Sequence, residues 1–376
     1  MSKRPKPAGR ASKSRQKPAR QASTARKQAR SVSKSAQKAA RHASESAKKD
    51  APDSSARDHA LSPSDNEEKN SSRRKNLIVG LGELLWDILP KGKELGGAPA
   101  NFAYMTSLLG DHGVVVSRVG KDRLGNAAAR RLARLGLSHG WLQIDKEHPT
   151  GTVKVEIAAD GQPKYEITES VAWDHFEWTP QWQELAQRAD AACFGSLAQR
   201  SRKSCETIRS FLRAMRPEAL KVFDVNLRQT FFTSGVLLES AKLADVMKLN
   251  HEELPLVATL LGYPENAKEP SAKWLLQKCG LKLVCVTEGM RGSYLVTPDS
   301  IDKHSGFPTQ VADTVGAGDA FTAALIHHHL RDASLTAMNE AANRMGSWVA
   351  SQVGATPKPD VVLLKTIRHA SAQSLD

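Results

Sequence analysis

The stretch DTVGAGDAFTAAL (residues 313–325) joins a glycine-rich turn to an alanine-rich run. The small residues Gly316 and Gly318 let backbone N–H groups approach a ligand closely. At the mouth of a helix, those donors and the helix dipole favour a phosphate or a developing negative charge. Asp319 would lie in the first helical turn, where the dipole keeps a carboxylate ionised. Such a carboxylate suits a general base for phosphoryl transfer, the alternative being an ordinary helix-start Asp.

Short apolar or β-branched runs alternate with helical stretches from residue 76 onward, which is typical of strands buried on both faces. The expected strands are Asn76–Leu81, Val114–Val119, Ala191–Phe194, Lys221–Val225, Asp245–Leu249 and Lys282–Thr287. The expected helices, which end near a glycine or a proline, are Pro99–Leu109, Asn126–Leu135 and Ser204–Met215. This alternation predicts an α/β sandwich around a mostly parallel sheet.

One stretch has the pattern of an antiparallel hairpin. Thr152–Ala158 alternates apolar and polar residues, Asp160-Gly161 offers a turn, and Lys164–Ile167 resumes the strand pattern. Inserted between parallel elements, the hairpin would form a small lid over the ends of the main sheet. The alternative is a surface hairpin without that role.

The net charge of +14 over 376 residues comes from the N-terminal segment. Residues 1–75 hold 21 of the 54 Lys and Arg and 7 of the 40 Asp and Glu, so the remaining 301 residues are neutral overall. Residues 1–44 contain no acid and only two large apolar side chains, which predicts disorder. This tail is either a binding segment for nucleic acid or another polyanion, a solvated extension without a partner, or a transit peptide. Residues 45–75 are typical of a linker.

The cysteine pattern and the hydropathy indicate a cytoplasmic protein. The four cysteines form no C-x-x-C pair and are typical of reduced, buried thiols. No apolar run approaches the roughly 18 residues that a membrane helix needs. The N-terminus has no apolar core of a signal peptide.

Segment 313–325 resembles the C-terminal signature of the ribokinase/fructokinase (pfkB) family of carbohydrate kinases. Three further segments are similar to family motifs and occur in the family's order: GGAPAN (96–101), NHEE (250–253) and TEGMRGS (287–293). The resemblance covers roughly residues 76–360. It implies a ribokinase-like three-layer α/β sandwich with a mostly parallel central sheet, formed by residues 76–365, and a small β lid around residues 88–98 and 150–170. It also implies transfer of the γ-phosphoryl group of ATP to a sugar hydroxyl.

The resemblance also assigns roles to individual residues. Asp319 corresponds to the catalytic base, and the backbone of Gly316, Ala317 and Gly318 to the anion hole. Glu253 would orient Mg²⁺ through water, because carboxylates and ATP phosphates are the usual Mg²⁺ environment. Asp313 matches a position associated with a monovalent cation, K⁺ being the candidate. The implied nucleotide-binding residues are Asn250, Thr287, Gly289, Gly292 and Asn343.

The implied sugar-binding residues are Asp87, Gly97, Asn101, Asn226 and Arg228. The carboxylate of Asp87 can accept hydrogen bonds from two hydroxyls, and Arg228 could contact a phosphate oxygen. The alternatives are a turn-initiating Asp87 and an Arg228 in a surface ion pair. Ala98-Pro99 and the segment 170–174 look fructokinase-like, which favours fructose and leaves other hexoses or a ketose derivative open.

Several other functions are weaker. A polyanion-binding protein could use the kinase-like domain as a passive scaffold. Gly80-Leu-Gly82 follows a strand, but Leu85 occupies the third glycine position of a dinucleotide fingerprint. Successive residues on a helix point about 100° apart, so His327-His-His329 cannot converge on one metal ion and is expected on a helix surface. A homodimer formed through the lid is a further expectation.

Overall fold

The computed structural model describes residues 75–89, 92–157, 163–264 and 270–369. The predicted disordered tail, the predicted linker up to residue 74 and the predicted turn at Asp160-Gly161 lie outside these residues.

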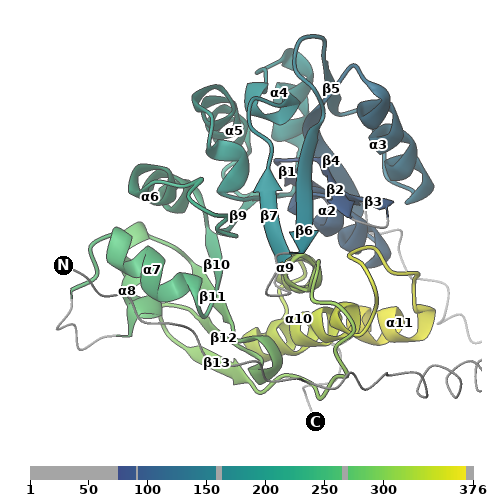
Figure 1. The fold of residues 1–376 in the computed structure, drawn as a ribbon. Coiled ribbons are helices and arrows are strands. Elements are labelled where there is room, and N and C mark those ends of the chain that lie inside the picture. Colours follow the sequence, from purple (N-terminus) through teal and green to yellow (C-terminus); the bar gives the residue numbers. More distant parts are fainter. Residues whose placement is uncertain (1–74, 90–91, 158–162, 265–269, 370–376) are drawn as a thin grey trace, which may run out of the picture. The chain divides into compact units, whose positions relative to one another are not determined.

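Nine strands form the central sheet, in the order β13-β12-β11-β10-β9-β8-β1-β4-β5 (Figure 1). The pairings from β5 to β11 are parallel, and β12 and β13 continue the sheet in antiparallel fashion. All six expected strands are present, with ends shifted by at most two residues. The bounds are β1 Leu77–Leu81, β4 His112–Gly120, β5 Leu142–Asp145, β8 Ala191–Phe194, β9 Leu220–Asp224, β10 Val246–Asn250, β11 Leu283–Thr287, β12 Ser293–Val296 and β13 Ile301–His304.

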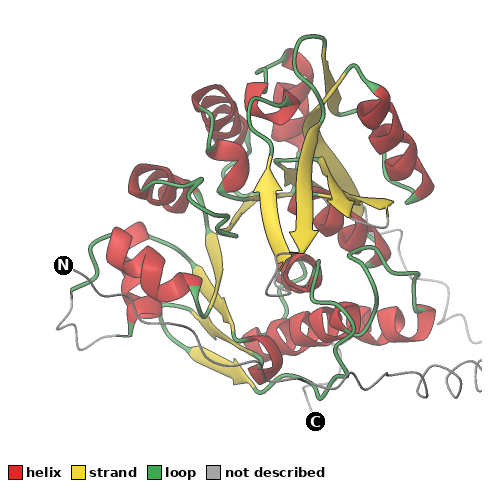
Figure 2. Cartoon of the chain, viewed as in Figure 1, coloured by secondary structure: helices red, strands yellow, loops and turns green. Residues whose placement is uncertain are grey.

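Helices cover both faces of this sheet, which confirms the predicted three-layer sandwich (Figure 2). The alternation along β1 shows why both faces are covered: Leu77, Val79 and Leu81 join one apolar cluster and Ile78 joins the other. The first cluster includes side chains of α4 Pro180–Arg188, α5 Arg202–Ala214, α6 Ser234–Leu243, α7 Glu253–Leu260 and α8 Ser271–Cys279. The second includes α2 Ala98–Leu108, α3 Arg123–Arg134, α9 Ala317–His329, α10 Leu335–Ala350 and α11 Val361–His369.

A second sheet of four strands forms the lid, in the order β3-β2-β6-β7. The predicted hairpin is present as β6 Gly151–Ile157 and β7 Pro163–Ile167, which pair in antiparallel register. The other two strands are β2 Leu85–Leu89 and β3 Gly92–Gly96, and β2 runs parallel to β6. The indole of Trp86 in β2 donates to the Leu124 carbonyl at 3.0 Å, which fastens this sheet to α3.

The expectation that the three histidines of α9 lie on a helix surface is wrong for two of them. His327 is 3% exposed and His328 is fully buried, because α9 packs between α2 and α10. His327 pairs with Asp111 at 2.6 Å, and His328 contacts the Ile367 carbonyl at 2.8 Å. The ring centroids of His327 and His328 lie 5.1 Å apart in an edge-to-face contact. The described residues contain no group of three His, Cys, Asp or Glu that could hold a metal ion.

Candidate active site

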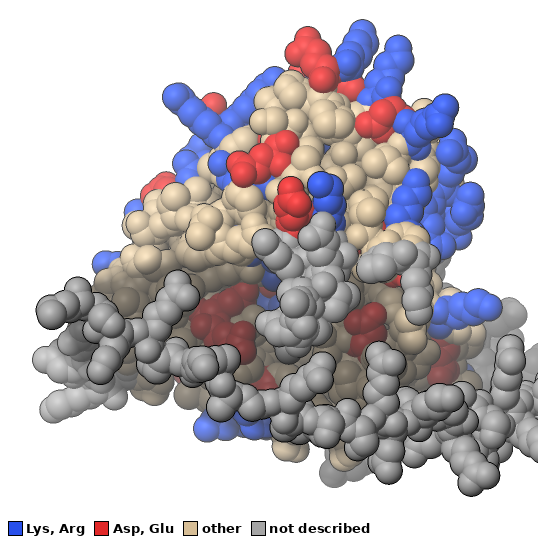
Figure 3. Space-filling view, in the orientation of Figure 1, with Lys and Arg blue, Asp and Glu red and all other residues tan. Residues whose placement is uncertain are grey.

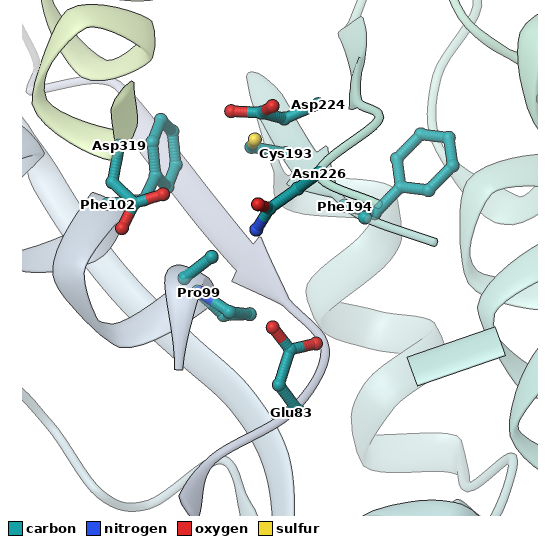
Figure 4. A pocket seen from close by; sticks show the side chains of 10 residues that line it. Glu83, Pro99, Phe102, Cys193, Phe194, Asp224, Asn226 and Asp319 are labelled. Carbon is teal, nitrogen blue, oxygen red and sulfur yellow. The ribbon is translucent and has the colours of Figure 1, made fainter. Parts of the chain in front are cut away.

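A pocket opens at the carboxyl ends of the central strands, between β1 on one side and β8 and β9 on the other (Figure 4). The chain builds the sheet from β1 in one direction through β4 and β5, and in the other through β8, β9 and β10. Ligands of open α/β sheets bind outside such a switch point. The pocket is lined by Glu83, Ala98, Pro99, Phe102, Cys193, Phe194, Gly195, Asp224, Asn226 and Asp319. The face drawn in Figure 3 is hollowed at its centre, and acidic side chains gather there.

Asp319 lies in the first turn of α9, as predicted. The helix starts after Gly316, whose φ of 78° falls in the left-handed region that favours glycine. A side chain at Gly316 would meet Ala355, with Cβ atoms 2.6 Å apart. No side chain of the described residues caps this helix end, which favours a ligand anion as the partner of its first N–H groups. The N–H of Ala317 points to the Thr314 carbonyl at 3.3 Å.

Burial has the largest effect on the protonation of Asp319. Burial and the neighbouring carboxylate of Asp224 raise its pKa to about 6, and they outweigh the contributions of Asn101, Lys248 and Arg228, which lower it. The sequence-based expectation of a carboxylate kept ionised by the dipole did not include this burial. Asp319 is nonetheless mostly ionised at pH 7, and a pKa near the working pH suits a general base.

The segment GGAPAN brings α2 against this carboxylate. Asn101 Nδ2 donates to Asp319 Oδ2 at 2.9 Å. The helix begins after Gly97, whose φ is 112°, and a Cβ there would lie 2.4 Å from the Glu83 carbonyl oxygen. A Cβ on Gly96 would lie 2.3 Å from Asp87 Oδ2. Both glycines are therefore required by close approach of the segment to residues 83–87.

Of the other predicted sugar-binding residues, Asn226 lines the pocket, whereas Asp87 and Arg228 do not. Asp87 lies in β2 rather than in a turn, and burial together with Glu94 raises its pKa to about 6. Arg228 is exposed and lowers the pKa values of Asp87, Glu83 and Asp319, so its charge lies within their electrostatic reach. Among the described residues, no ion pair of Arg228 is formed.

Asn226 lines the pocket, and its φ of 43° places it in the left-handed region that asparagine tolerates. Its backbone carbonyl accepts a hydrogen bond from Ser196 Oγ at 3.4 Å. The loop after β9 therefore places Asn226 beside the ends of β1 and β8, where the sequence predicted a sugar contact.

The N-x-x-E segment forms a reciprocal turn at the end of β10. Asn250 Oδ1 accepts the N–H of Glu253 at 2.8 Å, and Glu253 Oε2 accepts the N–H of Asn250 at 2.9 Å, the pattern of a capping box. Glu253 Oε1 accepts the N–H of Leu227 at 2.7 Å. Glu253 is 7% exposed, so its carboxylate joins the loops that follow β9 and β10.

The predicted nucleotide turn follows β11. Thr287 ends the strand, and the N–H of Glu288 donates to the Gly292 carbonyl at 2.7 Å. Gly289 and Gly292 have φ values of 62° and 87°. Asn343 lies in α10, where its Nδ2 donates to Ser293 Oγ at 2.7 Å and to the Asn339 carbonyl. Because this donor is used within the protein, a contact to adenine would involve Oδ1.

Asp313 precedes the glycine turn and supports it. Its Oδ1 accepts the N–H of Val315 and its Oδ2 accepts the N–H of Gly354, each at 3.0 Å. The carboxylate thus joins the loop before α9 to the loop after α10, beside the predicted cation position.

Three buried charged residues near the pocket were not identified from the sequence. Burial raises the pKa of Glu83, directly after β1, to about 7. Asp224 and Lys248 form an ion pair with a shortest distance of 3.0 Å between the end of β9 and the middle of β10. A lysine between Met247 and Leu249 in a strand expected to be buried on both faces was the available signal.

Comparison with known proteins identifies the family. Residues 92–361 match the model of the pfkB family carbohydrate kinases. The chain belongs to this family. It is an ATP-dependent sugar kinase, a phosphotransferase with an alcohol group as acceptor. No helix of the described residues is long and apolar enough to cross a membrane.

Three relatives cover most of the chain. Fructokinase-1 of Zea mays is 28% identical over 310 residues, which are 75% of this chain and 94% of the relative. A sugar kinase of Pyrococcus horikoshii is similar in structure, with a TM-score of 0.68 at 27% identity over 79% of this chain and 99% of its own. The same kinase has been solved with ATP (TM-score 0.64, 25% identity, 77% and 100% coverage). The fold is shared by a Vibrio cholerae fructokinase that binds fructose, ADP and potassium (TM-score 0.65, 23% identity, 78% and 98% coverage).

Proposed function

We propose that this kinase phosphorylates fructose. The observation that carries the proposal is the contact between Asn101 and Asp319, because it brings the fructokinase-like GGAPAN segment to the reacting end of the pocket. The similarity to the maize fructokinase supports the same substrate class. A different hexose or a ketose derivative is the alternative, since the sugar side of the pocket is defined only by Asp87, Asn101, Asn226 and Arg228.

Phosphoryl transfer follows from the positions of the site residues. A sugar hydroxyl held near Asp87 and Asn101 attacks the γ-phosphorus of ATP, and its proton passes to the carboxylate of Asp319. The P–O bond to ADP breaks, and the backbone from Gly316 to Gly318 together with Arg228 stabilises the charge on the transferred group. Asn101 orients Asp319 for proton transfer by its hydrogen bond at 2.9 Å.

The nucleotide and its cations would lie beyond this point, toward the ends of β10 and β11. Thr287, Gly289 and Gly292 would line the nucleotide site, with Asn250 and Asn343 nearby. Each oxygen of Glu253 already accepts one backbone N–H, so we propose that it holds Mg²⁺ through ordered water. We propose that the carboxylate of Asp313 lies beside a K⁺ ion, whose positive charge would balance the negative charge of Asp313.

Two measurements test the proposal. A panel of sugars in a coupled ADP-release assay should show the highest kcat/KM with fructose, and a clear preference for another sugar would refute that assignment. Asp319→Asn is nearly isosteric and should fold while losing turnover by several orders of magnitude. Near-wild-type turnover in this variant would exclude the assigned role of Asp319.

The remaining expectations concern the rest of the chain. We propose that residues 76–365 form the kinase domain, that the protein is cytoplasmic, that the lid mediates a homodimer, and that residues 1–44 bind a polyanion. Deleting residues 1–74 should abolish salt-dependent binding to nucleic acid and leave fructokinase turnover unchanged. Unchanged nucleic-acid binding after the deletion would exclude the role of the tail, and lost catalysis in a folded protein would show that the tail is required.

A further inference from the structure

A buried ion pair lies directly below the reacting end of the pocket. Lys248 is only 7% exposed, and its Nζ lies 3.0 and 3.1 Å from the two carboxylate oxygens of Asp224. The two residues are direct neighbours in the ladder between β9 and β10. A buried pair of this kind is a poor means of gaining stability, because desolvation of both charges offsets their attraction. Its position therefore suggests a role in the reaction.

The same pair contacts the first turn of α9. Asp224 Oδ2 accepts the hydroxyl of Thr322 at 3.0 Å, and this hydroxyl also lies 3.0 Å from the Gly318 carbonyl. A Cβ on Gly318 would lie 3.0 Å from Lys248 Nζ, so the ammonium group lies against the backbone of the proposed anion hole. Glycine at this position thus leaves room for the ammonium group of Lys248 on one side and for the proposed phosphoryl group on the other.

The charged groups around Asp319 show how the ion pair between Asp224 and Lys248 affects the pKa of Asp319. Asp224 and Glu83 are the acidic groups that face the site, and Lys248 and Arg228 are the basic ones. The thiol of Cys193 also faces this cluster, and its pKa is raised well above the ordinary value by burial. Without the ammonium, Asp224 would place an uncompensated negative charge beside Asp319.

We infer that Lys248 is a positioning residue for phosphoryl transfer, which holds the first turn of α9 and offsets the charge of Asp224 beside Asp319. This inference rests on the roles proposed above for Asp319 and for Gly316–Gly318. Lys248 is not among the residues that line the pocket, and it acts through the helix start and through the electrostatic potential at the base.

The test is the pH dependence of kcat/KM for the sugar, measured from pH 5 to pH 9 at saturating ATP. Lys248→Met removes a positive charge and should move the acid limb of the profile upward by about one pH unit. Asp224→Asn removes a negative charge and should move it downward by a similar amount. Lys278→Met, at an exposed lysine, is the matched control and should leave the profile unchanged.

Shifts of the acid limb in opposite directions in Lys248→Met and Asp224→Asn would identify an electrostatic effect. General damage to the site would lower kcat/KM in both variants without such opposite shifts. Glu83 and Asp87 also titrate near neutral pH, but neither Lys248 nor Asp224 perturbs their pKa values directly. Both groups perturb the pKa of Asp319, so the shifts report on Asp319. If Lys248→Met does not fold, Asp224→Asn and the double variant carry the test, and the double variant should lie between the single ones.

Two results separate this inference from the proposed function. An acid limb that stays at the wild-type position in Asp224→Asn and in every folded Lys248 variant, or that moves in the same direction in all of them, overturns the positioning role. If Asp319→Asn is inactive in that case, the role of Asp319 as base still stands. Retained turnover in Asp319→Asn would overturn the base assignment itself.

Discussion

Asn101 and Asp319 meet at 2.9 Å, although 218 positions separate them in the chain. One comes from the first turn of α2 and the other from the first turn of α9, so two helix starts face each other across the pocket. The two most specific motifs of the sequence thereby become one site. The motif of α9 supplies the carboxylate of Asp319, and the motif of α2 supplies the amide of Asn101 that orients it.

Asn101→Ala should lower kcat about 10- to 100-fold, which is the value of a hydrogen bond to a charged group. Its acid limb should also move upward, because the amide lowers the pKa of Asp319. The measurement is the pH profile of kcat at saturating sugar and ATP. Asn126→Ala, at an exposed position of α3, is the control. An unchanged profile in Asn101→Ala would show that the amide does not act on the base.

Asp319→Asn should be more stable than the wild type above pH 6. Folding raises the pKa of this acid from its ordinary value of 3.8 to about 6, so the folded state binds the proton more tightly and wild-type stability falls as the pH rises through this window. The variant lacks this loss, and the difference should reach about 1–3 kcal/mol. Urea denaturation at pH 4.5 and pH 7.5 measures it. A stability gap that does not widen between these two values would contradict the raised pKa.

Gly292→Ala should be far more damaging than Gly289→Ala, although both glycines belong to the same nucleotide motif. A Cβ on Gly292 would lie 1.9 Å from the His304 carbonyl oxygen, whereas nothing lies within 4 Å of a Cβ on Gly289. We expect a loss of about 2–4 kcal/mol for the first and about 1 kcal/mol for the second. Denaturation midpoints and the KM for ATP check this. Equal losses of stability in the two variants would mean that the turn rearranges to make room for a Cβ at position 292.

Asp111→Ala should destabilise the fold by about 3–5 kcal/mol, because it leaves the buried His327 and the partly exposed Arg331 without their carboxylate partner. Arg331 bonds Asp111 at 2.7 Å, and the two partners hold the pKa of Asp111 below its usual range in spite of burial. Glu206→Ala, which breaks the exposed pair with Arg202, is the control and should cost at most about 0.5 kcal/mol. Similar losses in the two variants would contradict the structural role of the buried cluster.

The strands were predictable because each is a short apolar run between breakers, and β1, β8 and β10 appear nearly where the pattern placed them. The site motifs were recognised through their joint resemblance to the pfkB family, because a glycine turn followed by an aspartate can also start an ordinary helix. The burial of His327 and His328 was not predictable, since it depends on α9 being enclosed by α2 and α10. The raised pKa of Asp319 depends first on burial and then on Asp224, which lies 95 positions earlier in the chain and approaches it only in the folded sheet.

The short connection between β1 and β2 has a mechanical consequence. Only residues 82–84 separate β1 of the large sheet from the first lid strand β2, and Gly82 has a φ of 153° there. A movement of the lid sheet relative to the large sheet would therefore change the backbone conformation of these three residues. Glu83 lies in this connection and lines the pocket, and Asp87 lies in the lid strand that follows, so a rotation here would move both carboxyl groups together.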